Sequence, residues 1–157
     1  IILIINQNKM MEIMSLQKYN FQYDKQATLI AYGNINNYCV EQCSCSYCEN
    51  FNVSRNEIYT PEFLKLLSKM GINYQREAEV YHIKAYDNNL HLYGGWFHFV
   101  GRLTHTVVQS NNRIKEAVRF GDNLKVFITE QTILVDTAFN DKPVLQLEFR
   151  VVTPWMI

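Results

Sequence analysis

The sequence predicts a single α+β domain in which a curled, mainly antiparallel sheet of five or six strands packs against one clear amphipathic helix at about residues 61–70. Several segments alternate between apolar and polar residues with a period of two, which is typical of half-buried strands. Turn residues separate these segments, and the sequence lacks the regular strand–helix–strand alternation that builds parallel sheets. The third feature of the predicted α+β fold is a cysteine-rich loop before the helix.

The length and composition suit one compact domain. The chain has 157 residues, of which 48% are hydrophobic and 13% aromatic, enough to bury one core. Met10, Met11 and Met14 follow an apolar start. We therefore expect a mis-started or disordered leader at residues 1–14 and a single globular domain at residues 15–157.

The charge pattern excludes two classes of partner. Lys and Arg number 15, Asp and Glu number 15, and no run of like charge marks a surface for nucleic acid or anionic lipid. The apolar segment Ile1–Ile5 falls far short of the roughly 18 residues that a membrane span needs. It also lacks the basic start and the cleavage site of a signal peptide. We expect a cytoplasmic protein without nucleic-acid or membrane partners.

The first element along the chain is predicted to be a strand at Ala27–Tyr32. These residues favour β structure, and Gly33 and Asn34 end the segment with a turn. The asparagines that follow favour irregular backbone. We therefore expect a loop that carries the cysteines, followed by one helical turn at Ser46–Asn50.

The helix at residues 61–70 has clear start and stop signals. Thr60 can cap it, Pro61 suits its first position, and Gly71 can end it in a left-handed conformation. Its apolar residues recur every three or four positions, and they are Phe63, Leu64, Leu66, Leu67 and Met70. This stripe predicts that the helix packs on the sheet.

The remaining strands are predicted from alternation and from the turns between them. They are Glu79–Tyr86, Leu90–Val108, Leu124–Val135 and Leu145–Val151, with turns at residues 87–89 and 140–143. In the last of them, the odd-numbered residues are apolar and the even-numbered ones polar. The segment Ile114–Phe120 is either a short helix or an edge segment.

All four cysteines fall between Cys39 and Cys48. Cys45 and Cys48 form a C-x-x-C pair, and Cys43 precedes it by two residues, so three sulfurs can converge on one zinc ion at about 2.3 Å each. The fourth ligand is either Cys39 or a histidine. The histidines are His82, His91, His98 and His105, which all fall in predicted strands rather than beside the loop. Glycines near His98 permit close backbone approach and make it the preferred histidine.

Other uses of the thiols stay open. Structural zinc sites usually split their ligands into two pairs roughly 12–20 residues apart, and no second pair exists here. Iron–sulfur spacings do not match. A C-x-x-C at a helix start is also typical of dithiol redox proteins, although the clear helix begins a dozen residues later and no βαβ unit surrounds the pair. The cysteines can also be purely structural.

Two motifs carry a resemblance to a known family. They are Cys43-x-Cys45-x-x-Cys48-x-Asn50-Phe51 and Tyr93-Gly-Gly-Trp-Phe-His-Phe-Val-Gly101. With the segments between them, they make residues 43–102 resemble a family of small uncharacterised bacterial proteins. The resemblance implies a common fold and a thiol set of Cys43, Cys45 and Cys48, with Cys39 outside it. It brings no established activity.

Aromatic residues gather in two neighbouring predicted strands. They are Tyr81, Tyr86, Tyr93, Trp96, Phe97 and Phe99, and they form either the core or a surface for a protein partner. Three functional hypotheses follow: a zinc-binding interaction or regulatory protein, a dithiol redox protein that uses Cys45 and Cys48, and a metal-free protein-binding module with an aromatic sheet surface. No catalytic triad or dinucleotide loop is present, so we do not expect an enzyme.

Overall fold

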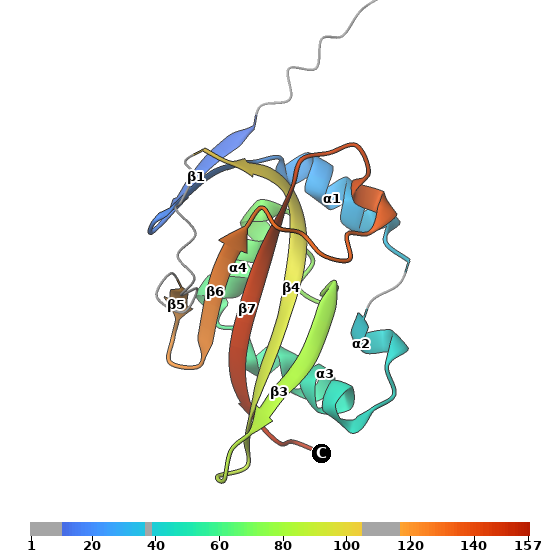
Figure 1. The fold of residues 1–157 in the computed structure, drawn as a ribbon, viewed down its shortest axis with the longest axis vertical. Helices are drawn as coiled ribbons and strands as arrows, with labels where there is room; N and C mark the ends of the chain where they lie inside the picture. Colours follow the sequence, from blue (N-terminus) through green and yellow to red (C-terminus); the bar gives the residue numbers. More distant parts are fainter. Residues whose placement is uncertain (1–10, 37–38, 105–116) are drawn as a thin grey trace, which may run out of the picture.

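The computed structural model describes residues 11–36, 39–104 and 117–157, and it confirms an α+β fold with a mainly antiparallel sheet (Figure 1). The described strands form one seven-stranded sheet in the order β1-β2-β4-β7-β6-β5, with β3 paired to β4, and they do not close into a barrel. The strands are β1 (Glu12–Leu16), β2 (Tyr19–Tyr23), β3 (Glu79–Ala85), β4 (Leu90–Leu103), β5 (Val118–Phe120), β6 (Leu124–Thr129) and β7 (Val144–Pro154).

The helices are α1 (Lys25–Asn34), α2 (Cys39–Gln42), α3 (Ser46–Ile58) and α4 (Pro61–Met70), and a short 3-10 helix, η2, spans Thr137–Phe139. In the view of Figure 1, α3 and α4 lie behind the sheet. Within the described part of the chain, no helix is long and apolar enough to cross a membrane.

The centre of the sheet is the long pairing of β4 with β7, which runs in register from Leu90 opposite Pro154 to Val100 opposite Val144. The predicted alternation of β7 is confirmed, because its buried apolar positions are the odd-numbered ones from 145 to 151. Phe149 contacts the rings of Phe51 and Tyr59 on α3 and just beyond it. The odd-numbered face therefore packs against α3, and the even-numbered face points away from it. The end of the even-numbered face at Gln146 is covered by residues before η2, since the Ile133 backbone N–H donates to the Gln146 side chain at 2.9 Å.

The segment predicted to be a strand at residues 27–32 is instead part of α1. Asp24 caps this helix by accepting a hydrogen bond from the backbone N–H of Ala27 at 2.8 Å. The buried residues are Ala27, Thr28, Ala31 and Tyr32, whose spacing suits a helix and not a strand. Burial of this face outweighs the local preference of the sequence for β structure.

The single helical turn predicted at residues 46–50 is the start of α3, which has 13 residues. Its buried face includes Cys48, Phe51 and Arg55, which lie one turn apart. Asn50 and Ser54 are also buried, so polar side chains interrupt the apolar stripe. This mixture hides the helix from a search for apolar periodicity.

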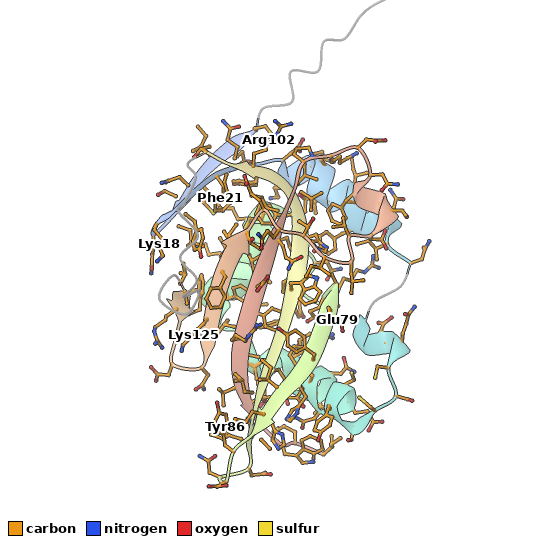
Figure 2. The ribbon with its side chains drawn as sticks, in the orientation of Figure 1. Lys18, Phe21, Glu79, Tyr86, Arg102 and Lys125 are labelled. Carbon is orange, nitrogen blue, oxygen red and sulfur yellow. The ribbon has the colours of Figure 1, made fainter. Side chains whose placement is uncertain are left out.

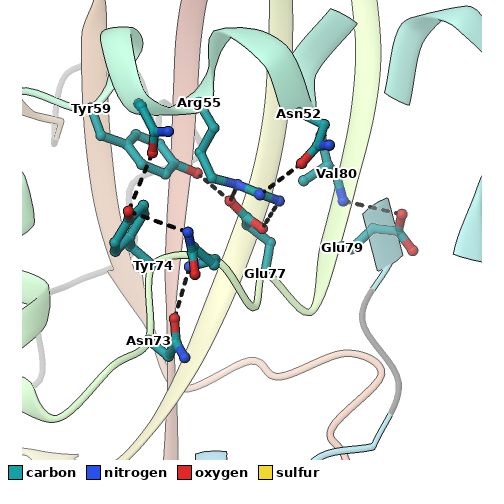
Figure 3. Close-up of polar contacts among 10 residues, drawn as sticks. Asn52, Arg55, Tyr59, Asn73, Tyr74, Glu77, Glu79 and Val80 are labelled. Carbon is teal, nitrogen blue, oxygen red and sulfur yellow. Dashed lines mark hydrogen bonds and ion pairs between the residues drawn. The ribbon is translucent and has the colours of Figure 1, made fainter. Parts of the chain in front are cut away.

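The polar residues of α3 have buried partners. The Nε and Nη2 atoms of Arg55 donate to the two carboxylate oxygens of Glu77 at 2.9 and 2.8 Å, and the Tyr59 hydroxyl donates to Glu77 at 3.0 Å. The side chains converge beneath α3 in Figure 3. Burial raises the pKa of Glu77, and Arg55 opposes that rise. The cluster connects α3 to the segment that precedes β3.

The hairpin of β1 and β2 was not predicted. Its second strand, Tyr19–Tyr23, alternates buried and half-buried residues, and Phe21 is fully buried (Figure 2). Residues 12–14, which were expected to lie in a leader, belong to β1, and Met14 is buried. Residues 1–10 lie outside the described part of the chain.

Two predicted strand boundaries change in the second half of the chain. The strand predicted to reach Val135 ends at Thr129, whose hydroxyl accepts a hydrogen bond from the backbone N–H of Gln131 and starts a turn. Residues 118–120 form the edge strand β5. The predicted ends at residues 105–108 and 114–116 lie outside the described residues.

The boundaries of α4 are confirmed, and its end supports a stability prediction. Gly71 has φ 80°, and a Cβ atom there would lie 2.6 Å from the Lys25 carbonyl oxygen. We expect Gly71→Ala to lower the free energy of unfolding by about 1–2 kcal/mol, because it adds left-handed strain to this close contact. Urea unfolding checks this. The exposed neighbour Lys69→Ala is the control, and equal losses in both variants would contradict the prediction.

Candidate metal centre

The three sulfurs predicted to converge do meet at the start of α3. Cys45 is the N-cap residue of the helix, and Cys48 lies in its first turn. The Sγ atoms of Cys43 and Cys45 are 3.2 Å apart, and all three Sγ atoms lie within 4.8 Å of one another. The three thiols are free, and their burial ranges from exposed Cys45 through partly exposed Cys43 to buried Cys48.

This spacing fits one thiophilic metal ion. Two sulfurs bound to the same tetrahedral zinc at about 2.3 Å lie about 3.8 Å apart, which is close to the spacing found here. Among the His, Cys, Asp and Glu side chains that the structure describes, these three form the one group compact enough to share an ion. All three ligands come from six consecutive residues, so little chain has to move to close the site.

The two fourth-ligand candidates differ in position. Cys39 begins α2, four residues before Cys43, and its side chain lies outside the described part of the structure. The structure does not bring His98 to the cluster: its ring is buried and hydrogen-bonded to the Gln146 side chain at 3.0 Å. His98 pairs with an even-numbered residue of β7, so it lies on the face of the sheet opposite α3.

The pKa values of the two thiols in the C-x-x-C pair shift in opposite directions. The backbone N–H of Cys48, followed by the thiols of Cys43 and Cys48, lowers the pKa of the exposed Cys45. Burial raises the pKa of Cys48, and the two neighbouring thiols add to the rise. A helix N-terminus favours a negative charge at this position. Cys45 is therefore the first of the pair to become a thiolate.

The first turn of α3 is held in place by aromatic residues and histidines. Tyr47 stacks on His82 with ring centres 4.1 Å apart, and Trp155 meets Tyr47 edge-on at 5.8 Å. The Tyr93 hydroxyl donates to the Tyr47 carbonyl oxygen at 3.0 Å. Tyr47 lies between Cys45 and Cys48, so these contacts fix the backbone that carries the thiols.

His82 corrects one expectation, because it lies beside the cysteine segment even though it belongs to a strand. Its Nε2 atom is 2.9 Å from Nδ1 of His91, so the two rings share a hydrogen bond. Burial and the neighbouring His91 lower the pKa of His82. The stacking with Tyr47 joins segments 35 residues apart in sequence, and no local motif in the chain could have indicated it.

The predicted aromatic surface divides between two faces. Tyr93, Phe97 and Phe99 are at most 1% exposed and belong to the core. Tyr81 and Trp96 pack against each other on the opposite face, and Tyr86 is exposed at the end of β3. The aromatic residues that remain on the face opposite α3 are therefore half of the predicted set.

Comparison with models of known protein families, with curated proteins and with solved structures gives no match.

Proposed function

We propose that this protein binds one zinc ion through Cys43, Cys45 and Cys48, and that the loaded site serves an interaction or regulatory role. The observation that supports this most directly is the convergence of three free sulfurs within 4.8 Å. Thiolates are ligands that zinc prefers, and three of them leave one coordination position. Cys39 is the remaining sequence-based candidate for that position. We also propose that residues 43–102 belong to the family of small bacterial proteins that they resemble.

A bound ion would add a direct link between α2 and α3. Cys43 follows α2 and Cys48 lies in the first turn of α3, so one ion would tie both helices together. Exposed Cys45 would place the ion close to the protein surface. Since metal binding to the folded chain adds to its stability, zinc would hold α2 against the start of α3, beside the exposed Tyr47 ring. These are surfaces that a protein partner can contact.

The proposal predicts one zinc per chain in untagged protein purified without added metal. We expect Cys45→Ser/Cys48→Ser to lose the ion, because two of the three described ligands are removed, and Ser44→Ala to retain it, because Ser44 lies between ligands without joining the group. Elemental analysis gives the metal content, and a thiol count in native and denatured protein shows protection. Metal-free protein whose thiols all react in the native state would contradict the proposal.

A second candidate function is dithiol exchange, which the position of Cys45 and Cys48 favours. Cys45 is exposed at the N-cap of the 13-residue α3, and Cys48 is buried one turn on. This corrects the expectation that the nearest long helix begins a dozen residues later. No strand leads directly into the pair, however, because α2 precedes it, whereas thioredoxin-like proteins place the pair in a βαβ unit.

The chemistry of this second candidate is a two-electron exchange. The Cys45 thiolate attacks a substrate disulfide, forms a mixed disulfide and releases one substrate thiolate. Cys48 then loses its proton and attacks Cys45 of the mixed disulfide, so the second substrate thiol leaves and a Cys45–Cys48 disulfide remains. In the metal measurement above, a metal-free protein in which two thiols oxidise and reduce reversibly would favour this function over zinc binding.

A further inference from the structure

A row of three cations crosses the face of the sheet opposite α3. In the register of the strands, Arg119 on β5 is opposite Lys125 on β6, Lys125 is opposite Arg150 on β7, and Arg150 is opposite Gly94 on β4. Like charges directly opposite each other on neighbouring strands repel and destabilise a sheet. Among the described residues, none of the three cations forms an ion pair with a carboxylate. A negative charge bound over the row would relieve this repulsion.

Two neighbours hold the Arg150 guanidinium close to the sheet. Its guanidinium lies 5.4 Å from the centre of the Tyr81 ring, and its Nη1 atom donates to the Phe149 carbonyl oxygen at 3.1 Å. Gly94 makes this possible, because a Cβ atom there would lie 2.6 Å from Nη1 and 2.7 Å from the Tyr81 ring. Gly94 of the Gly94-Gly95 motif thus leaves room for the Arg150 and Tyr81 side chains on this face. A guanidinium fixed in one plane is suited to bidentate binding of an acidic group.

A cavity of about 440 Å³ lies over the cationic row. Leu92 and Val152 line one side of it, and Phe127 lines the other. Figure 2 places Tyr86 at the end of the β3–β4 hairpin and Lys125 on β6. The cations therefore line the middle of the cavity, and apolar side chains line its two sides. Its volume lies in the range of sites for small molecules.

Two carboxylates also border this cavity, Glu148 and Asp122. The Glu148 side chain is buried, and one of its carboxylate oxygens accepts a hydrogen bond from the Gln146 side chain at 3.0 Å. Asp122 is exposed in the turn between β5 and β6. The lining as a whole therefore carries one net positive charge, while the cross-strand row itself carries three.

We propose that this groove binds a small amphipathic anion. Its acidic group meets Arg150 and Lys125, and its apolar body lies against Leu92, Val152 and Phe127. A polyanion such as nucleic acid fits less well, because the cations are few and are flanked by apolar side chains instead of by further charge. This site is on the opposite face of the sheet from the cysteines and does not depend on the metal.

The probe for this proposal is 1-anilinonaphthalene-8-sulfonate, which combines an anionic group with an apolar body and fluoresces when bound. We expect saturable binding of one probe per chain. The variant Lys125→Gln/Arg150→Gln should weaken it at least tenfold, and Lys65→Gln, which removes an exposed charge from α4, should not change it. Circular dichroism and thermal unfolding should show the double variant folded, because removing adjacent like charges relieves repulsion.

A competition experiment tests the same site without any variant. Decanoate should displace the probe from the wild-type protein, and methyl decanoate, which has the same apolar chain without the charge, should do so at least tenfold less well. Equal displacement by the two compounds, probe binding without saturation, or unchanged binding in the folded double variant would each overturn the proposal.

Discussion

Replacing Arg55 with methionine is expected to lower the free energy of unfolding by about 3–5 kcal/mol at pH 7, because it leaves the buried charge of Glu77 without its cation. The Glu77 side chain is 1% exposed. The Tyr59 hydroxyl still donates to Glu77 at 3.0 Å, but one hydrogen bond does not replace a bidentate ion pair. Methionine fills a similar volume, so lost packing contributes little. Urea unfolding followed by circular dichroism measures the change.

The pH dependence of this loss identifies its cause. Burial raises the pKa of Glu77 above its ordinary value of 4.5, while Arg55 lowers it, so removing Arg55 raises the pKa further. A carboxyl group whose pKa is higher in the folded state favours folding below the unfolded-state pKa, and this contribution is lost as the pH rises through the folded-state pKa. The destabilisation of Arg55→Met should therefore grow as the pH increases above about 4.5.

Two further variants separate charge from packing. Arg102→Met makes the same change at an exposed position on β4 and should alter stability by less than about 0.5 kcal/mol at any pH. Arg55→Met/Glu77→Gln removes the uncompensated charge and should recover part of the loss at pH 7. A loss that is equal at every pH and is unchanged in the double variant would show that the ion pair is not the cause.

The parts of the fold that the sequence predicted are those whose signals are local. Thr60, Pro61 and Gly71 define α4 by themselves, and the alternation of β7 shows which side chains enter the core. The sequence did not predict α1, because its β-prone residues become helical only when tertiary packing buries Ala31 and Tyr32. The full length of α3 was missed for a related reason, since the partner of its buried Arg55 lies 22 residues away.

The same distinction applies to the two sites. The cysteines converge because they are neighbours in the chain, so their sequence spacing was sufficient to predict the cluster. The cationic row combines Arg119, Lys125 and Arg150 from three strands, and each appears in the sequence as an ordinary polar position on a solvent face. Only the register between strands shows that the three are adjacent.

Phe51 connects the core to the thiol cluster, which makes it the most informative core residue to change. It is fully buried and contacts the rings of Tyr59, Tyr93 and Phe149. It also lies one turn after Cys48 on α3. We expect Phe51→Ala to lower the free energy of unfolding by about 3–5 kcal/mol, through lost burial and the cavity left among these rings.

The same variant should expose a thiol that the wild-type fold protects. Cys48 is 8% exposed, so a disulfide reagent reaches it when the first turns of α3 open, and weaker docking of α3 makes that opening more frequent. In metal-free protein, Cys48 should therefore react faster in Phe51→Ala than in the wild type, while exposed Cys45 should react at a similar rate. Urea unfolding and the rate of thiol modification measure the two effects separately.

Val53→Ala is the matched control, since Val53 lies on the same helix but is 53% exposed. It should change stability by less than about 0.5 kcal/mol and leave the reaction of Cys48 unaltered. If Phe51→Ala destabilises the fold while Cys48 stays as slow as in the wild type, the thiol is protected by its own turn of helix and by Tyr93 instead of by the docking of α3. If both variants behave alike, Phe51 does not anchor the helix, and the cysteine cluster must derive its rigidity from the contacts of Tyr47 with His82 and Trp155.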